Sequence, residues 1–204
     1  MQTILIATHN PAKLKEIIDN LEKLIVQKIK IISLKDLKIT KEPKETGKNF
    51  AENSLLKAKY YAKISGLPTI ADDGGIEIDV FNGEPGVNSK RWLGYDATDK
   101  EIIDYLLYKI SKYDLIKRTA HLKTCITFFD PKTNIYLQET EEIDGKIANK
   151  LADKYQKGFP YRALFIVDKY QKYYDELSEK EHYEINHRIK ALKKLEEKII
   201  NLIK

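Results

Sequence analysis

The sequence contains few of the features that stabilise very small or membrane-embedded proteins. Its 204 residues include one cysteine, Cys125, so no disulfide can form within the chain. No run of about eighteen apolar residues occurs, and no basic segment precedes an apolar run near the N-terminus. Neither an internal repeat nor a low-complexity linker is present. These absences exclude a disulfide-stapled miniprotein and predict a soluble, cytoplasmic protein that does not bind membranes.

Charges of both signs are spread along the chain. The sequence has 36 basic and 31 acidic residues, for a net charge of +5. Because the two signs are interspersed, most lysines are expected on solvated faces, which argues against a nucleic-acid partner. With 42% hydrophobic residues, the chain is long enough to bury a full core, and a single domain is expected over residues 1–204. Cys125 lies in the alternating segment HLKTCITFF, which predicts a core thiol on a strand.

Hydrophobic periodicity predicts alternating strands and helices. Strands are expected at residues 3–8, 28–33, 68–72, 75–81, 118–129 and 135–143. Helices are expected at residues 12–24, 49–66 and 98–111, and in a C-terminal segment whose apolar residues recur at steps of three and four: Ile185, Ile189, Leu192, Leu195, Ile199 and Leu202. Asn49 and Thr98 are expected N-caps, with Glu101 completing a capping box. The pattern predicts an α/β fold of mixed strand direction, with a hairpin around DPKTN extending the sheet.

The segment THNPAK lies between the first predicted strand and the first predicted helix. The free amides of a helix N-terminus favour an anion, and Lys13 is close enough in sequence to reach the same anion. The alternative is an ordinary strand-to-helix turn in which Asn10 and Pro11 start the helix.

A second candidate segment is the helix ETGKNFAENSLLKAKYYA. Asn53 and Lys57 are four residues apart, so their side chains share one helical face. Glu45 lies just upstream in a turn that contains glycine. The alternative is an amphipathic helix whose charges are merely solvated.

The third candidate, TIADDGGIEID, places Asp72 and Asp73 at the end of a predicted strand. Two buried carboxylates cannot easily both be ionised unless a cation neutralises them. Hard oxygen ligands suit Mg²⁺, so one acid is expected to bind the ion while the other takes a proton from water. The alternative is a solvated hairpin turn of the Asp-Gly type.

The fourth candidate, INHRIKAL, brings His187 and Arg188 together on the last predicted helix. The pair can bind a phosphate or a base carbonyl. The alternative is a packed or surface histidine with no ligand.

In this order and spacing, the four segments closely resemble the inosine/xanthosine triphosphate pyrophosphatase family, which hydrolyses non-standard purine nucleoside triphosphates. The resemblance covers essentially the whole chain and is most specific from Glu45 to Gly94. It implies an α/β fold with an elongated mixed β-sheet, flanking helices and two lobes around a central nucleotide cleft, usually as a homodimer. It also implies Mg²⁺-dependent conversion of a purine nucleoside triphosphate to the monophosphate and pyrophosphate.

The resemblance assigns roles to residues of the phosphate and metal end. Thr8, Asn10 and Lys13 match a phosphate-binding turn, Glu45 matches a metal ligand, and Asp73 matches a metal ligand that also accepts a proton. Carboxylates alone would repel a triphosphate, so this arrangement makes sense only with a divalent ion between them and the substrate.

Further polar residues of the site follow from the same resemblance. Asp72 and Lys57 are expected to act with the metal-binding acid, and Asn53 is expected to contact the substrate. Lys57 would stabilise charge on the phosphates. His187 and Arg188 match the pair at the nucleobase end.

The nucleobase end departs from the family pattern. Gly74 stands where the family has serine, and GFPYRALF at residues 158–165 replaces a pattern close to G-F-G-Y-D-P-x-F. The substrate-binding residues expected in these altered segments are Gly74, Phe159, Tyr161, Arg162 and His182. Because arginine only donates hydrogen bonds, Arg162 favours a 6-oxo purine, so ITP or dITP is expected to bind better than ATP.

These departures leave a second hypothesis open. The protein is then a catalytically weak or inactive (d)ITP-binding sensor subunit that acts with an effector protein. The tyrosine-rich segment DKYQKYYDELSEKEHYE carries more aromatic residues than a solvated helix needs, which is the reason to consider a protein partner.

Overall fold

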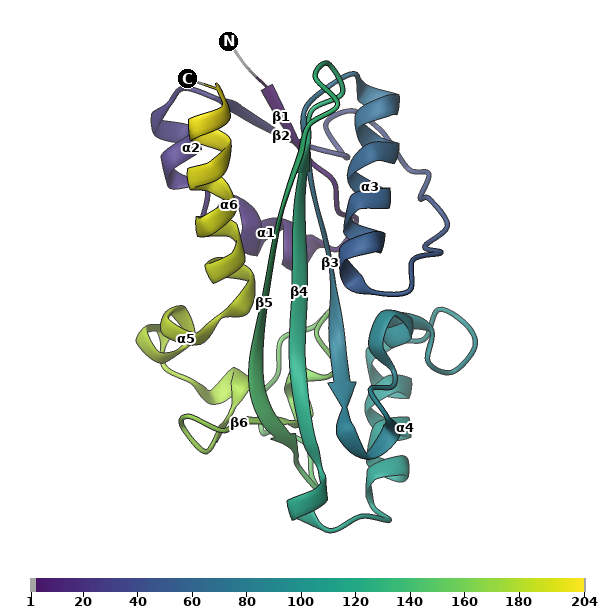
Figure 1. The fold of residues 1–204 in the computed structure, drawn as a ribbon. Helices are drawn as coiled ribbons and strands as arrows, with labels where there is room; N and C mark the ends of the chain where they lie inside the picture. The colour runs from purple at the N-terminus through teal and green to yellow at the C-terminus, as the bar shows by residue number, and fades with distance from the viewer. Residues whose placement is uncertain (1–2, 204) are drawn as a thin grey trace. The chain divides into compact units, whose positions relative to one another are not determined.

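A computed structural model describes residues 3–203 of the chain and shows an α/β fold (Figure 1). Its seven strands form one sheet in the order β2-β1-β3-β4-β5-β6-β7. The strands are β1 (Thr3–Ile6), β2 (Lys30–Ser33), β3 (Thr69–Ile78), β4 (Thr119–Phe129), β5 (Tyr136–Ile147), β6 (Phe165–Val167) and β7 (Lys172–Tyr173). Strand β1 runs parallel to β2 and β3, whereas β6 runs antiparallel to β5 and β7. The predicted mixed α/β sheet is confirmed.

Six α-helices lie in the described part of the chain. They are α1 (Pro11–Ile18), α2 (Glu22–Val26), α3 (Phe50–Ser65), α4 (Asp99–Ile110), α5 (Glu179–Ile185) and α6 (His187–Ile203). Within residues 3–203, none of the helices has the length and apolar character needed to cross a membrane.

The chain forms two compact units. Unit 1 contains the described residues up to Asp73, Thr124–Glu141, and the described residues from Arg188 onward. Unit 2 contains Gly74–Lys123 and Glu142–His187. Strands β3, β4 and β5 each contribute residues to both units. The expectation of a single domain over residues 1–204 stays a prediction.

Strand β1 is buried on both faces, which explains its unbroken run of apolar residues. Because side chains alternate along a strand, Ile4 and Ile6 enter one cluster while Leu5 and Ala7 enter another. The first cluster contains buried residues of α1, α2 and α6, namely Ile17, Leu24, Leu192, Leu195 and Ile199. The second contains buried residues of α3, namely Ala58, Tyr61 and Ala62. Unit 1 therefore has a layer of helices on each side of its strands.

Unit 2 has its own core beneath α4. The buried face of α4 consists of Ile102, Ile103, Leu106 and Ile110. These residues belong to one cluster with apolar residues of the three long strands: Ile76, Ile78, Ala120, Leu122, Ile143 and Ile147.

Several local predictions are confirmed. Asn49 caps α3 by accepting a hydrogen bond from the Glu52 amide, and the helix ends at Gly66 in the left-handed conformation. Thr98 and Glu101 form the capping box of α4. Strands β4 and β5 are neighbours around DPKTN, and Cys125 is fully buried.

The predicted turn between two strand segments at residues 68–81 is wrong. Strand β3 runs without interruption through both acids and both glycines. Thr69 and Ile70 pair with β1, and β4 is the other neighbour of β3, so the ladder on both sides overrides the turn preference of the Asp-Gly sequence. A Cβ atom on Gly75 would lie 2.1 Å from Ser89 Oγ, so close packing explains this glycine.

Two predicted helices are each divided into two. The expected helix at residues 12–24 becomes α1 and α2, and the Asn20 side chain donates to the Glu16 carbonyl where α1 ends. The expected C-terminal helix breaks at Asn186, whose ψ of 111° is not helical. Ile185 packs in the core of unit 2, whereas the next apolar residues of the pattern belong to unit 1. Leu202 was expected on the buried face but is 39% exposed.

The start of α2 depends on a glutamate from α6. Leu21 at the N-cap position provides no side-chain cap, and Glu196 Oε1 instead accepts a hydrogen bond of 2.7 Å from the Leu24 amide. Glu196 is 2% exposed, and burial raises the pKa of its carboxyl group. Helices α2 and α6 are thus joined by a buried acceptor that sequence periodicity does not reveal.

We predict that Glu196→Ala lowers the free energy of unfolding by about 1–2 kcal/mol, because a helix amide loses its acceptor. Glu196→Gln keeps an acceptor. Because the folded-state pKa of Glu196 is raised, its proton-linked stability is present below the ordinary pKa and is lost as pH rises. Urea unfolding between about pH 4 and pH 7 should therefore show that the free energy of unfolding of Glu196→Gln rises relative to that of the wild type as pH increases. A difference in unfolding free energy that does not change with pH would show that titration of Glu196 does not affect stability.

Candidate active site

A partly buried lysine on α3, Lys57, joins two carboxylates in unit 1. Lys57 Nζ lies 2.7 Å from Asp73 Oδ1 and 3.1 Å from Glu45 Oε1. Asp73 is on β3 and Glu45 is in the segment that precedes α3. The three side chains are between 10% and 23% exposed, so the charges interact in a largely water-poor environment. The structure therefore brings the two predicted metal ligands to the same ammonium group.

Asn53 holds the segment that carries Glu45. Its Oδ1 accepts a hydrogen bond of 2.8 Å from the Gly47 amide, and the residue is 1% exposed. A Cβ atom on Gly47 would lie 2.6 Å from the same oxygen, so the contact requires glycine. This contact fixes the backbone two residues after Glu45. The predicted contact of Asn53 with substrate stays a prediction.

A second group of charges surrounds Asp72 in unit 1. Asp72 Oδ2 lies 3.1 Å from Lys13 Nζ and accepts a hydrogen bond of 3.1 Å from Arg188 Nε. Arg188 Nη1 also donates to Glu16 Oε2 at 2.6 Å. Asp72 and Arg188 are almost fully buried, so each charge needs its partners. Sequence reasoning found Lys13, Asp72 and Arg188 but missed Glu16.

One signal in the sequence points to Glu16. It lies three residues after Lys13, so both side chains share one face of the short helix α1. An acid beside a lysine that is predicted to bind phosphate is unexpected unless another cation is near, and Arg188 provides that cation. The arginine is separated from Glu16 by 172 positions, so periodicity alone could not reveal the pair.

The two adjacent acids have opposite pKa shifts. Burial favours protonation of Asp72, but Lys13 and Arg188 outweigh it and hold the pKa of Asp72 well below its ordinary value. Burial raises the pKa of Asp73, although Lys57 acts in the opposite direction. Burial also works against the charge on Lys57, yet Asp73 and Glu45 raise the pKa of this lysine. Asp72 therefore remains ionised, whereas Asp73 is the more readily protonated acid.

The segment THNPAK forms a capped helix start. Asn10 Oδ1 accepts hydrogen bonds from the amides of Ala12 and Lys13, and Pro11 is the first residue of α1. Thr8 Oγ1 accepts a hydrogen bond from the Asn10 amide. These contacts match the simple-turn interpretation of the segment, but the same turn also directs Lys13 to the buried acid Asp72.

The donor set of this site fits a divalent ion such as Mg²⁺. Asp73 Oδ2 is buried and has no hydrogen-bond partner in the described part of the chain. Together with Glu45 it offers hard carboxylate oxygens, and Mg²⁺ is commonly bound by one or two carboxylates plus substrate phosphates and waters. Within residues 3–203, no third histidine, cysteine or acid completes a three-residue metal-ligand cluster here. The residues thus fit an ion that the substrate helps to bind.

The residues predicted for the nucleobase end belong to unit 2, except Arg188, which belongs to unit 1. The Arg162 guanidinium carbon lies 3.6 Å from the centre of the Phe159 ring and 4.6 Å from that of Tyr174. His182 contacts Tyr174 edge-on, with ring centres 5.0 Å apart. Arg162 is 3% exposed, so its planar faces are covered by aromatic rings. Its donation to a 6-oxo purine stays a prediction.

The remaining predicted residues of unit 2 have identifiable surroundings. Tyr161 donates a hydrogen bond of 2.6 Å to the Ser89 carbonyl, and burial raises the pKa of its phenol. Gly74 follows the paired acids within β3, and His187 is buried at the start of α6. No described contact assigns these three residues to a ligand.

We predict that Asp72→Asn lowers the free energy of unfolding by about 3 kcal/mol, because it leaves two buried cations with too little negative charge. The pKa of Asp72 is depressed, so its contribution is present above the ordinary value of 3.8 and is lost as pH falls further. Denaturant unfolding of the metal-free protein should show that the difference in free energy of unfolding between the wild type and Asp72→Asn becomes smaller in acid. Asp19→Asn, at an exposed ion pair, should change stability by less than about 1 kcal/mol. Equal losses for the two variants would contradict the buried network.

Comparison with known proteins agrees with the fold. The model of the Ham1 family matches residues 4–198. A dITP/XTP pyrophosphatase of Bacillus subtilis (strain 168) is 35% identical over 197 residues, covering 96% of each chain. The structure of a HAM1 protein from Coxiella burnetii has a TM-score of 0.85 at 33% identity, covering 98% of this chain and 100% of that one. The Staphylococcus aureus Ham1 protein has a TM-score of 0.82 at 30% identity, covering 98% and 99%. The chain therefore belongs to the Ham1 family.

Proposed function

We propose that this protein hydrolyses ITP, dITP and XTP to the monophosphate and pyrophosphate with the help of Mg²⁺. The observation that carries the proposal is the Glu45–Lys57–Asp73 group, in which the buried Asp73 Oδ2 has no hydrogen-bond partner among residues 3–203. Relatives named dITP/XTP pyrophosphatases match this chain over nearly its full length, which favours an enzyme over an inactive sensor subunit. By the same resemblance, we infer a homodimer that works in the cytoplasm.

Glu45 and Asp73 would hold the divalent ion between them and the phosphates. When bound, the ion supplies positive charge that neutralises the carboxylates and polarises a phosphate oxygen. Lys57 contacts both acids, so its ammonium group would lie near the ion and could stabilise the negative charge that develops on the transferring phosphate. A raised pKa makes the Asp73 carboxylate a stronger base than an ordinary aspartate, which suits a group that would accept a proton from the attacking water.

The Asp72 network would allow Lys13 to change partners. Without substrate, Lys13 and Arg188 share Asp72, and Arg188 also contacts Glu16. If Lys13 turns to a substrate phosphate, Asp72 retains Arg188 and is not left as an unpaired buried charge. Burial lowers the pKa of Lys13, and the negative charge of a phosphate partner would oppose this shift.

The aromatic group of unit 2 supports the proposed preference for deaminated purines. Phe159 and Tyr174 offer π faces, and Arg162 is an obligate donor packed against them. The 6-oxo group of hypoxanthine can accept a hydrogen bond from this donor, whereas the 6-amino group of adenine is not an acceptor. His187 and Arg188 are proposed to complete recognition of the nucleoside.

The proposal predicts that hydrolysis requires Mg²⁺, releases pyrophosphate, and is at least about tenfold faster for ITP than for ATP, the scale of one hydrogen bond to a charged group. A panel of ITP, dITP, XTP, GTP and ATP, with separate detection of pyrophosphate and orthophosphate, tests all three points. Release of orthophosphate as the first product would contradict the proposed reaction.

Asp73→Asn is the matched variant for the same assay, and it should lower kcat on the order of 10²-fold or more if Asp73 accepts the proton. Asp19→Asn makes the same chemical change at an exposed ion pair and should retain the wild-type rate. An unchanged rate in Asp73→Asn would remove this residue from the mechanism.

A further inference from the structure

The strands of unit 2 carry a second group of charged side chains. On β4, Ala120 and Leu122 are buried in the core, so Thr119, His121 and Lys123 lie on the opposite face of the strand. The same alternation places the acids of the neighbouring strands on this face: Glu77 of β3, and Glu142 and Asp144 of β5. Asp79 directly follows the end of β3. None of these residues belongs to the site described above.

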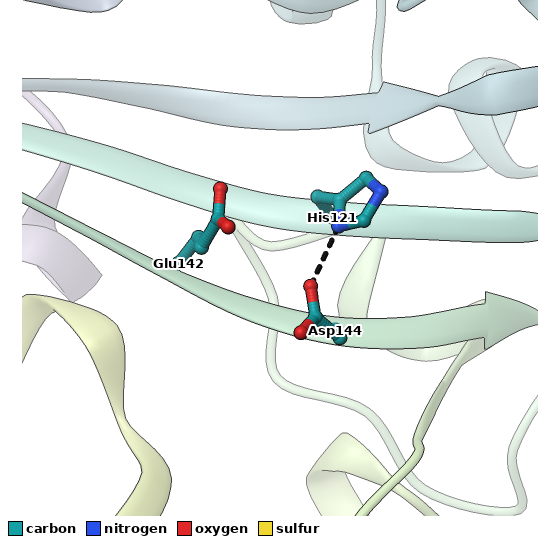
Figure 2. Close-up of side chains that lie close together, drawn as sticks. All are labelled: His121, Glu142 and Asp144. Atoms are coloured by element: carbon teal, nitrogen blue, oxygen red, sulfur yellow. Dashed lines mark hydrogen bonds and ion pairs between the residues drawn. The ribbon is translucent and has the colours of Figure 1, made fainter.

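His121, Glu142 and Asp144 lie together on this face (Figure 2). One ligand atom from each of the three residues falls within 4.8 Å of the other two. His121 Nδ1 lies 2.7 Å from Asp144 Oδ1, across the pair of neighbouring strands. Glu142 precedes Asp144 by two positions, so both carboxylates are on one face of β5.

The second ring nitrogen of His121 also faces a carboxylate. Nε2 lies 3.3 Å from Asp79 Oδ1, and the Thr119 hydroxyl donates a short hydrogen bond to Asp79 Oδ2. A histidine that binds metals through one nitrogen usually donates from the other to a carboxylate, which fixes the tautomer and the ring orientation. Asp79 supplies that carboxylate, and Thr119 holds it in place.

The acidic side chains on this face outnumber the basic ones. Lys123 Nζ lies 2.8 Å from Glu77 Oε2 and 3.1 Å from Glu142 Oε2, so one ammonium group is paired with two acids. Asp79 and Asp144 have His121 as their shared partner. Four carboxylates therefore share one lysine and one histidine on this face, and this excess of negative charge favours a divalent ion.

We propose that His121, Glu142 and Asp144 form a binding site for a divalent transition-metal ion of the Zn²⁺ type. His121 would bind through Nδ1, Glu142 and Asp144 through one carboxylate oxygen each, and Asp79 would accept the hydrogen bond from Nε2. Imidazole is a preferred ligand of zinc, whereas magnesium favours oxygen ligands alone, so the site differs in selectivity from the Glu45–Asp73 pair.

The side chains can reach the required geometry without a change of the backbone. Ligand atoms of a tetrahedral zinc site are about 3.4 Å apart, given metal–ligand distances near 2.1 Å. The three groups are already within 4.8 Å of one another, and the side chains of Glu142 and Asp144 are 52% and 64% exposed. The ion would connect β4 to β5 and, through Asp79, to β3, so it should stabilise unit 2.

Equilibrium dialysis against Zn²⁺ in excess Mg²⁺, without nucleotide, tests this proposal on the full chain. We expect one bound zinc per chain in the wild type and a loss of affinity of about 100-fold in His121→Ala. Asp79→Asn keeps all three ligands and should weaken binding by about 10-fold through the loss of orientation. Zinc should also raise the Tm of the wild type but not of His121→Ala.

Two controls separate this site from others. Asp96→Asn removes one exposed acid elsewhere in unit 2 and should bind zinc as the wild type does. Asp73→Asn should also retain zinc, because the inference does not depend on the proposed function or on its metal. Absence of stoichiometric zinc in the wild type, or retention of zinc in His121→Ala, would overturn the proposal.

Discussion

The structure depends on the placement of two adjacent acids in a buried strand. Successive side chains of a strand point to opposite faces, so Asp72 and Asp73 enter different environments. Asp72 meets Lys13 and Arg188 on the side of α1 and α6, where Ile70 also packs. Asp73 meets Lys57 of α3, on the side where Ala71 packs. Neither acid can be buried as an ion without its cation, so the surrounding helices must supply lysine and arginine at these positions.

This division explains how two chemically identical side chains acquire different roles. Asp72 is matched by two cations and remains a fixed negative charge that orients Lys13 and Arg188. Asp73 shares Lys57 with Glu45, and its Oδ2 has no hydrogen-bond partner in the described part of the chain, so it is the acid that can accept a proton or an ion. The proposed chemistry thus follows from alternation along one strand and from the number of cations on each face.

The sequence predicts these features unevenly. Local signals were sufficient to predict where α3 and α4 begin. The side chains of Asn49, Thr98 and Glu101 accept hydrogen bonds from backbone amides only a few residues away. The turn at the paired acids was predicted wrongly, since the Asp-Gly preference is local whereas the ladder around β3 is formed by distant strands. Glu16 and Glu196 were missed for the same reason: their partners Arg188 and Leu24 are 172 positions away. The resemblance, rather than periodicity, supplied Glu45 and Lys57 as members of one site.

The most direct test of this account is a carboxyl-carbon NMR titration of the two acids in the metal-free protein. Because Lys13 and Arg188 surround Asp72, its pKa should lie below the ordinary value of 3.8. Because burial outweighs the attraction of Lys57, the pKa of Asp73 should lie above that value. Two shifts of opposite sign would support the division of roles between the faces of β3. Shifts in the same direction for both acids would contradict it.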